Sequence, residues 1–164
     1  MFKTIETERL KIRPMCRQDA EFILSLVNSA GWIKYIGDRK INNIQDSEQY
    51  IQKILSNPNY FYHIFELKDT VTPIGIVTFL FREDYKYPDI GFAMLPDFEN
   101  NGYAFEASKK YLDTVCEIES IQKVIAITLP QNTSSIKLLQ KLGLYYKETI
   151  TEGEEYLFLF EISI

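Results

Sequence analysis

Apolar and polar residues alternate along the chain with two different periods, and each period predicts a type of element. Residues 7–15 (TERLKIRPM) alternate apolar with basic positions and close with Pro14, which predicts a first strand. From Asp19 to Gly31 the apolar residues recur every three or four positions, which predicts an amphipathic helix. A strand followed by a helix is therefore expected at the start of the domain.

A long polar loop and a second helix come next. Apolar residues return to helical spacing in 44–55 (IQDSEQYIQKIL), where Asp46 followed by Gln49 matches the side-chain cap of a helix start. The stretch 31–45 before it has no such spacing. We therefore expect a loop over 31–45 and a helix capped by Asp46.

Short apolar runs bounded by polar turns predict most of the remaining elements. Residues 60–67 and 73–83 are separated by the polar stretch KDTVT, so we expect an antiparallel strand pair. The further elements predicted in chain order are a strand at 87–95, a helix at 104–115, a strand at 123–129, a helix at 135–143, and strands at 144–150 and 154–162 that meet at Gly153. This order predicts one α+β (α/β) domain over 1–164, with a mixed sheet of about seven strands and helices on both faces.

The corner DFENNGYAFEAS (97–108) has the strongest turn composition in the chain. Asn101-Gly102 alone would predict a tight hairpin, because both central residues of such a turn need positive φ. The residues that follow have helical spacing, so the corner is interpreted as strand, loop and helix start. The first N–H groups of a helix have no internal partners, and the helix dipole places partial positive charge there. An anion site is expected at this corner.

Composition narrows the classes of function. The chain has 164 residues, of which 46% are hydrophobic and 14% aromatic, enough for a sizeable core. The formal charge is −5 without a run of basic residues, so nucleic-acid and membrane-surface binding are not expected. No apolar run approaches the roughly 20 residues of a membrane span, and the N-terminal stretch lacks an apolar signal core. Cys16 and Cys116 have no metal-ligand spacing, so we expect reduced thiols, no metal and a cytoplasmic protein.

Four stretches resemble one known family in the same order along the chain. They are TERLKIRP, GWIKYIGDR with DSEQYI, DIGFAMLPDFENNGYAFEAS and NTSSIKLLQKLGL. Together they resemble the GNAT acyl-CoA N-acyltransferase superfamily, in particular its ribosomal-protein-alanine N-acetyltransferase-like branch, over nearly the full length. The resemblance implies a single GNAT domain, acetyl-CoA as cosubstrate and an amine acceptor, in a monomer or homodimer.

The resemblance also implies which residues bind acetyl-CoA. The implied residues are Phe92, Ala93, Met94, Leu95, Asn100, Asn101, Gly102, Tyr103, Ala104, Asn132 and Ser135. Gly102 and Ala104 stand at the family's small positions, where a larger side chain would hold a pyrophosphate away from backbone amides. Glu99 replaces the family's Arg or Gln. The backbone amide of Met94 is the implied donor to the thioester carbonyl, a type of contact worth roughly 3 to 4 kcal/mol.

Side chains with implied catalytic and acceptor roles lie elsewhere. Asp89 stands where this branch often has a glutamate and is the implied general base. Leu139 stands where many relatives have a tyrosine as general acid; a thiol with a pKa of about 8.5 leaves tolerably without one. Trp32 and Tyr35 are implied to flank the acceptor entrance, with packing over the first helices as the alternative. His63, the only histidine, is expected to be a half-buried structural residue.

These expectations lead to an N-acetyltransferase that acts on a primary amine by direct attack in a ternary complex. Neither cysteine is placed as a covalent carrier. At pH 7 an α-amino group needs about 1 kcal/mol to become neutral, whereas a lysine needs roughly 4.6 kcal/mol, which favours an N-terminal or other weakly basic amine. The alternatives are a catalytically degenerate acyl-CoA-binding or peptide-binding module and an enzyme that modifies a small-molecule amine or antibiotic.

Overall fold

The computed structural model describes residues 3–118 and 120–164. In chain order the elements are β1 (Ile5–Glu6), β2 (Leu10–Pro14), η1 (Arg17–Asp19), α1 (Ala20–Val27), α2 (Ala30–Tyr35), α3 (Ile44–Leu55), β3 (Tyr60–Leu67), β4 (Thr72–Leu80), β5 (Asp89–Met94), η2 (Pro96–Phe98), α4 (Tyr103–Cys116), β6 (Lys123–Thr128), α5 (Thr133–Lys141), β7 (Tyr145–Glu152) and β8 (Glu155–Ser163). The strands form one eight-stranded sheet in the order β1-β2-β3-β4-β5-β6-β8-β7. Among the described strands, β5 and β6 are the one pair that runs in parallel, so the sheet is mixed.

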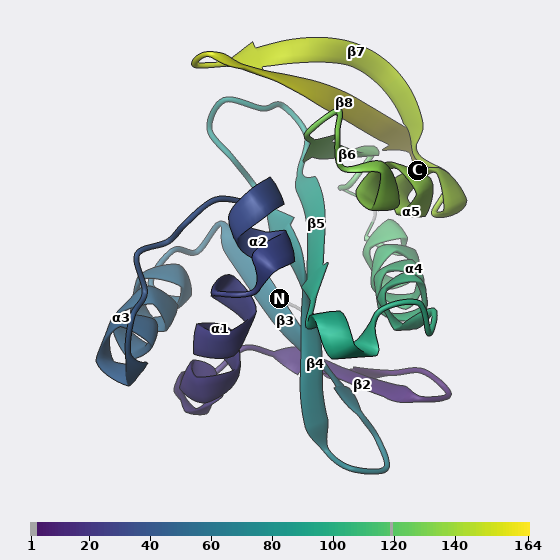
Figure 1. The fold of residues 1–164 in the computed structure, drawn as a ribbon. Coiled ribbons are helices and arrows are strands. Elements are labelled where there is room, and N and C mark those ends of the chain that lie inside the picture. The colour runs from purple at the N-terminus through teal and green to yellow at the C-terminus, as the bar shows by residue number, and fades with distance from the viewer. Residues whose placement is uncertain (1–2, 119) are drawn as a thin grey trace.

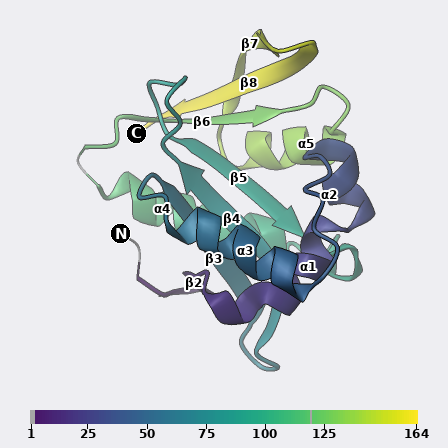
Figure 2. The same cartoon turned by 90° about the vertical axis from the view of Figure 1, so that its left-hand side faces the viewer.

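Helices cover both faces of the sheet, with α1, α2 and α3 on one side and α4 and α5 on the other (Figures 1 and 2). Successive side chains of β4 point to opposite faces: Ile76 joins the core under α1 and α3, and Val77 joins the core under α4. A strand that is buried on both faces has apolar residues at consecutive positions of its sequence, as most of β4 does. The predicted α+β architecture is confirmed. Among the described residues, no helix is long and apolar enough to cross a membrane.

The first predicted strand is shorter than expected, and the sheet gains one further edge strand. The Thr7 amide donates to the Leu10 carbonyl over 2.9 Å, so the chain turns there. Residues Ile5–Glu6 then pair antiparallel with β2 as strand β1. The expected count of about seven strands thus becomes eight, because a two-residue strand carries too little periodicity to be seen in the sequence.

Two predictions about helix ends were wrong, and in both cases a nearby side chain provides the reason. The first helix does not reach Gly31: the Ser29 side chain accepts from the Trp32 amide and starts the separate helix α2, so part of the expected 31–45 loop is helical. Helix α3 is capped by Asn43, whose Oδ1 accepts from the Asp46 amide over 2.9 Å. Asp46 therefore lies in the first turn, where its charge suits the helix dipole.

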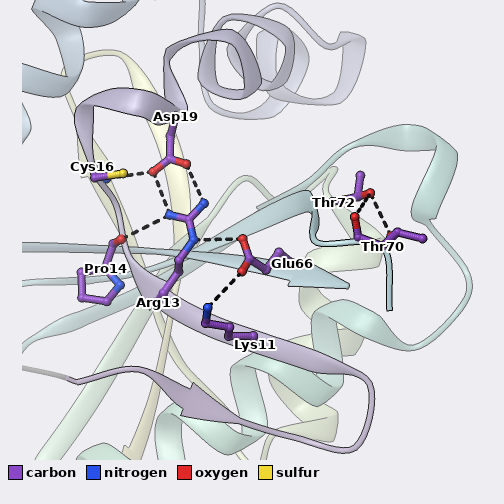
Figure 3. A network of polar contacts seen from close by, with 8 residues as sticks. All are labelled: Lys11, Arg13, Pro14, Cys16, Asp19, Glu66, Thr70 and Thr72. Atoms are coloured by element: carbon purple, nitrogen blue, oxygen red, sulfur yellow. Dashed lines mark hydrogen bonds and ion pairs between the residues drawn. The ribbon is translucent and has the colours of Figure 1, made fainter. Parts of the chain in front are cut away.

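A network of charged side chains fixes the start of α1 to the sheet (Figure 3). The Arg13 guanidinium lies 2.7 Å from Asp19 Oδ1 and 2.9 Å from Glu66 Oε2, and both carboxylates are buried. Burial raises the pKa of Asp19, but hydrogen bonds from Arg13 and the Cys16 amide outweigh it and lower the pKa below its usual range. A buried charge pair that is hydrogen-bonded in this way fixes geometry. It holds β2, β3 and η1 in register.

Candidate functional site

Strands β5 and β6 begin side by side and then separate. Strand β5 pairs with β4 along its whole length, from Asp89 opposite Leu80 to Met94 opposite Gly75. With β6 it pairs at Asp89 opposite Ile125 alone, and Figure 2 shows the two strands diverging beyond that point. The edge of β5 that faces β6 is therefore open past its first residue.

The backbone of β5 directs donors into this opening. The Leu95 amide donates to the Ile74 carbonyl of β4 over 2.9 Å. Consecutive N–H groups of a strand point to opposite sides, so the Met94 and Phe92 amides point away from β4, toward the opening. This is the orientation that the sequence-based role of Met94 as a backbone donor requires.

The corner between β5 and α4 leaves several helix amides without partners inside the helix. Gly102 is the N-cap of α4 with φ +79°, and it has no side chain to cap the helix. The first hydrogen bond of the helix runs from the Glu106 amide to the Gly102 carbonyl over 3.0 Å. The preceding amides of Tyr103, Ala104 and Phe105 therefore lack an intrahelical acceptor, which is the geometry of an anion site.

The asparagines of the corner shape the loop. Asn100 has φ +62°, a conformation that asparagine tolerates better than most residues. The Asn101 side-chain amide donates to the Phe98 carbonyl over 3.2 Å and to the Glu99 carbonyl over 2.9 Å, which closes the loop. The side chain of Glu99 is exposed to solvent, where its charge is screened.

Arg9 belongs to this site, although sequence reasoning missed it. Its Nη1 donates to the Asn101 carbonyl over 3.0 Å, and its guanidinium lies 4.4 Å from the centroid of the Tyr103 ring. Its Nε donates to Glu106 Oε2 over 2.7 Å. Arg9 and Glu106 are 97 positions apart, so no local pattern could have indicated this contact.

The second implied motif lies at the start of α5. Asn132 Oδ1 accepts from the Ser135 amide over 3.2 Å, so this asparagine caps the helix. Lys141 of the same helix lies over the ring of Phe105 on α4, 4.3 Å from its centroid. Leu139 is buried in the core, and its side chain carries no proton donor. The helices of the two motifs are thus in contact.

Asp89 is buried at the first residue of β5, next to the point where the sheet opens. It is 5% exposed, and its Oδ2 lies 2.8 Å from Arg82 Nη2. Burial raises the pKa of Asp89 to about 7, a shift that Arg82 opposes and that the negative charge of Glu152 reinforces. Glu152 itself accepts from the Tyr85 hydroxyl over 2.6 Å. Asp89 can therefore gain and lose a proton near neutral pH.

The residues expected to flank the acceptor entrance lie on α2. Trp32 is buried in the core formed with α1 and α3, so the packing alternative describes it. Its Nε1 is also buried and has no acceptor among the residues that the structure describes. Tyr35 is partly exposed, with Lys34 Nζ 4.8 Å from its ring centroid. The expectation of a half-buried His63 was wrong: it is 2% exposed, and its ring packs against Tyr111.

Metal ligands do not gather in the described part of the chain. Within residues 3–118 and 120–164, no three or more side chains of His, Cys, Asp and Glu lie close enough to hold an ion. Cys16 and Cys116 are partly buried free thiols, and burial raises the pKa of each. The polar groups described along β5 and at its two ends are the outward-pointing backbone amides, Asp89 and the Arg9–Glu106 pair.

Comparisons with known proteins identify the family of the chain. Residues 9–145 match the family described as acetyltransferase (GNAT) domain. The uncharacterized N-acetyltransferase YnaD of Bacillus subtilis is 26% identical over 157 residues, which cover 93% of this chain and 91% of YnaD. A GNAT-family acetyltransferase from Bacillus anthracis shares the fold with a TM-score of 0.82 and 23% identity, covering 98% of each chain. RimL, a ribosomal α-N-protein acetyltransferase solved in complex with coenzyme A, has a TM-score of 0.86 and 11% identity, covering 99% of this chain and 98% of RimL. The chain belongs to the GNAT family of acetyltransferases.

Proposed function

We propose that the protein transfers the acetyl group of acetyl-CoA to a primary amine by direct attack in a ternary complex. The observation that carries the proposal is the opening of β5 away from β6, with an uncapped helix start at its end and a buried acid of near-neutral pKa at its beginning. Between these two features, β5 runs for about 17 Å from Asp89 to Met94 at 3.3 Å per residue. An extended arm bound along the strand spans that distance.

The residues present fit acyl-CoA. The amides of Tyr103, Ala104 and Phe105 would hold its pyrophosphate, and Gly102 allows close approach because it has no Cβ. The pantetheine arm would lie along the open edge of β5, over Phe92–Leu95. Acetyl-CoA supplies the acetyl group as a thioester. The structure of RimL with coenzyme A supports this assignment through the shared fold.

Different groups of the chain carry out the steps of acetyl transfer. An arm extended along β5 from the α4 corner carries the thioester past Met94 toward Asp89, so the Phe92 amide, which points into the same opening, fits the donor role better than the Met94 amide expected from the sequence. This amide donates to the thioester carbonyl oxygen and draws electron density from its carbon. Asp89, whose pKa burial raises to about 7, accepts the proton of the attacking amine directly or through water. A base of this strength matches an α-amine with a pKa of about 7.7 to 8.0 better than a lysine. Leu139 offers no proton, so the thiol group leaves as the thiolate.

We further propose that the acceptor is a protein N-terminal α-amine or a small molecule of similar basicity. RimL, named as an α-N-protein acetyltransferase, supports the first of these by its fold. A catalytically degenerate acyl-CoA-binding module is the second candidate, because the buried Leu139 stands at the general-acid position and has no proton to donate. Thiol release from acetyl-CoA, measured over peptides with free N-termini and over small amines, separates the two. Binding without turnover on the whole panel would favour the module.

Acetyl-CoA is expected to stabilise the protein against heat. A ligand at 100 times its Kd adds about 2.7 kcal/mol to the free energy of unfolding. For a chain of 164 residues this raises Tm by roughly 5–10 °C. Differential scanning fluorimetry measures the shift, with adenosine at equal concentration as control. An unchanged Tm at millimolar acetyl-CoA would contradict both candidate functions.

Gly102→Val is expected to weaken CoA binding by at least about tenfold while the fold persists. A β-branched residue is strained by roughly 1–3 kcal/mol at φ +79°, so the corner relaxes away from its binding conformation. Gly153→Val is the matched control, because Gly153 has φ +60° with open space around it in the distant β7–β8 turn. Calorimetric titration with CoA compares the two variants. Equal CoA affinity in both would show that the corner does not bind the phosphates.

A further inference from the structure

Arg9 and Glu106 form an ion pair that joins the segment before β2 to the first turn of α4. Arg9 Nε donates to Glu106 Oε2 over 2.7 Å, and Arg9 Nη2 lies 2.6 Å from the same oxygen. The second oxygen, Oε1, accepts from the Arg9 amide over 3.0 Å and from the Thr7 hydroxyl over 2.5 Å. The carboxylate of Glu106 is therefore held by the turn before β2.

The same guanidinium holds the loop on both sides of Gly102. Arg9 Nη1 donates to the carbonyl of Asn101, the residue before the glycine. The guanidinium carbon lies over the ring of Tyr103, the residue after it. A Cβ on Gly102 would lie 3.6 Å from Arg9 Nη2, so the charge is next to the corner itself.

Glu106 places a negative charge in the first turn of α4, and Arg9 neutralises it. Burial raises its pKa, but hydrogen bonds from Thr7 and Arg9 outweigh the burial and hold the pKa below its usual range, so the side chain is ionised at neutral pH. An unpaired carboxylate in the first turn of α4 would repel a phosphate bound to the same helix start. The guanidinium, 44% exposed, neutralises that charge.

We infer that Arg9 is a positioning residue for the phosphate groups of acyl-CoA. It fixes the Asn101 carbonyl so that the Gly102 corner keeps its shape, and it neutralises Glu106 so that the helix start remains attractive to anions. The inference rests on the proposed function, because it assigns Arg9 to the same acyl-CoA site. It adds a residue from outside the β5–α4 segment to that site.

Binding of CoA to the full chain, measured by isothermal titration calorimetry, tests this role. Arg9→Ala is expected to weaken CoA binding about tenfold, the equivalent of about 1.4 kcal/mol, in line with one lost charge-assisted hydrogen bond. Arg9→Lys is expected to recover only part of the affinity, because an ammonium group lacks the planar fork of the guanidinium. Adding Glu106→Gln to Arg9→Ala is expected to tighten binding again, because the unneutralised charge is removed.

Two controls separate positioning from general damage. Pantetheine lacks the phosphates, so its affinity, followed by amide chemical shifts, is expected to be the same in wild type and Arg9→Ala. Lys109→Ala removes an exposed ion pair with Asp113 on the same helix and is expected to leave CoA binding unchanged. Should Arg9→Ala prove unfolded in a thermal scan, Arg9→Lys serves for the same comparison.

The outcomes distinguish the inference from the function on which it rests. A wild-type chain that binds no CoA would contradict the proposed function. A wild-type chain that binds CoA, with Arg9→Ala within twofold of its Kd, would overturn the role of Arg9 alone. Equal weakening of CoA and pantetheine binding by Arg9→Ala would also overturn it, because the loss would then not involve the phosphates.

Discussion

Asp89→Asn is expected to lower kcat/KM about 100-fold or more and to remove one of the two ionisations on the acid side of its pH profile, which leaves only that of the acceptor amine. General-base catalysis contributes roughly 10²- to 10⁴-fold, and an asparagine cannot accept the proton. Because burial raises the pKa of Asp89 to about 7 and an α-amino acceptor titrates at about 7.7 to 8.0, wild-type kcat/KM should rise with pH through both values and then level off. Thiol release between pH 5.5 and 9, with a peptide acceptor that supports turnover, measures both effects.

The same substitution is expected to stabilise the protein above pH 7. The folded pKa of Asp89, about 7, lies above the usual value of 3.8, so the folded state holds a proton that the unfolded state has released between these values. Stability attributable to Asp89 therefore falls as pH rises through this window, by at most about 4 kcal/mol. Asp89→Asn removes that loss, so its Tm should exceed the wild-type Tm at pH 8 and match it near pH 4.

Asp84→Asn is the matched control for both measurements. Asp84 is an exposed acid in the loop between β4 and β5, so its replacement should change neither the pH profile nor the Tm. Persistence of both ionisations on the acid side of the profile in Asp89→Asn would contradict the assignment of Asp89 as base. In that case a higher Tm of Asp89→Asn at pH 8 would still show that the buried Asp89 charge destabilises the fold. The pH profile and the Tm therefore test two separate properties of Asp89.

Elements of the fold were predictable where the information is local. Strand β3 matches the expected 60–67 range, and the other long elements differ from expectation by a few residues at their ends. Periodicity of apolar residues carries this information, because each face of an element needs a regular spacing to bury itself. The start of a helix depends on a single side-chain hydrogen bond. For α2 and α3 the sequence could not show that Ser29 and Asn43, and not other polar residues nearby, make that bond.

Site residues were likewise predictable where the reason is local and not where it depends on distant parts of the chain. Gly102 was predictable because a glycine between a strand and a helix has a local conformational reason, and the structure gives it positive φ. The burial of Asp89 depends on β6 and on Arg82, which come from other parts of the chain, so its raised pKa was not visible in the sequence. Arg9 was missed for the same reason. Long-range contacts decide which polar residues become chemically unusual.

Gly75→Ala is expected to destabilise the fold by about 3 kcal/mol, which corresponds to a fall in Tm of roughly 6–12 °C. Gly75 lies in β4 opposite Met94 of β5 on one side and opposite Phe65 of β3 on the other. A Cβ there would lie 2.1 Å from Cζ of Phe65 and 2.6 Å from the Ala93 carbonyl oxygen. The buried ring and the β5 backbone must both move to admit it.

The control and the rescue identify the cause of that loss. Gly31→Ala adds the same methyl group to helix α2 with nothing within 4 Å, so it should stabilise by about 0.5–1 kcal/mol. Phe65→Leu in the Gly75→Ala background removes the ring clash and leaves the contact with Ala93, so the two substitutions should couple favourably in a double-mutant cycle. Calorimetric titration then measures the affinity of this double variant for CoA. Any loss of affinity that Phe65→Leu does not recover is attributed to displacement of β5 at Ala93 and Met94. Wild-type CoA affinity in a destabilised Gly75→Ala chain would contradict the assignment of the β5 edge as the acyl-CoA track.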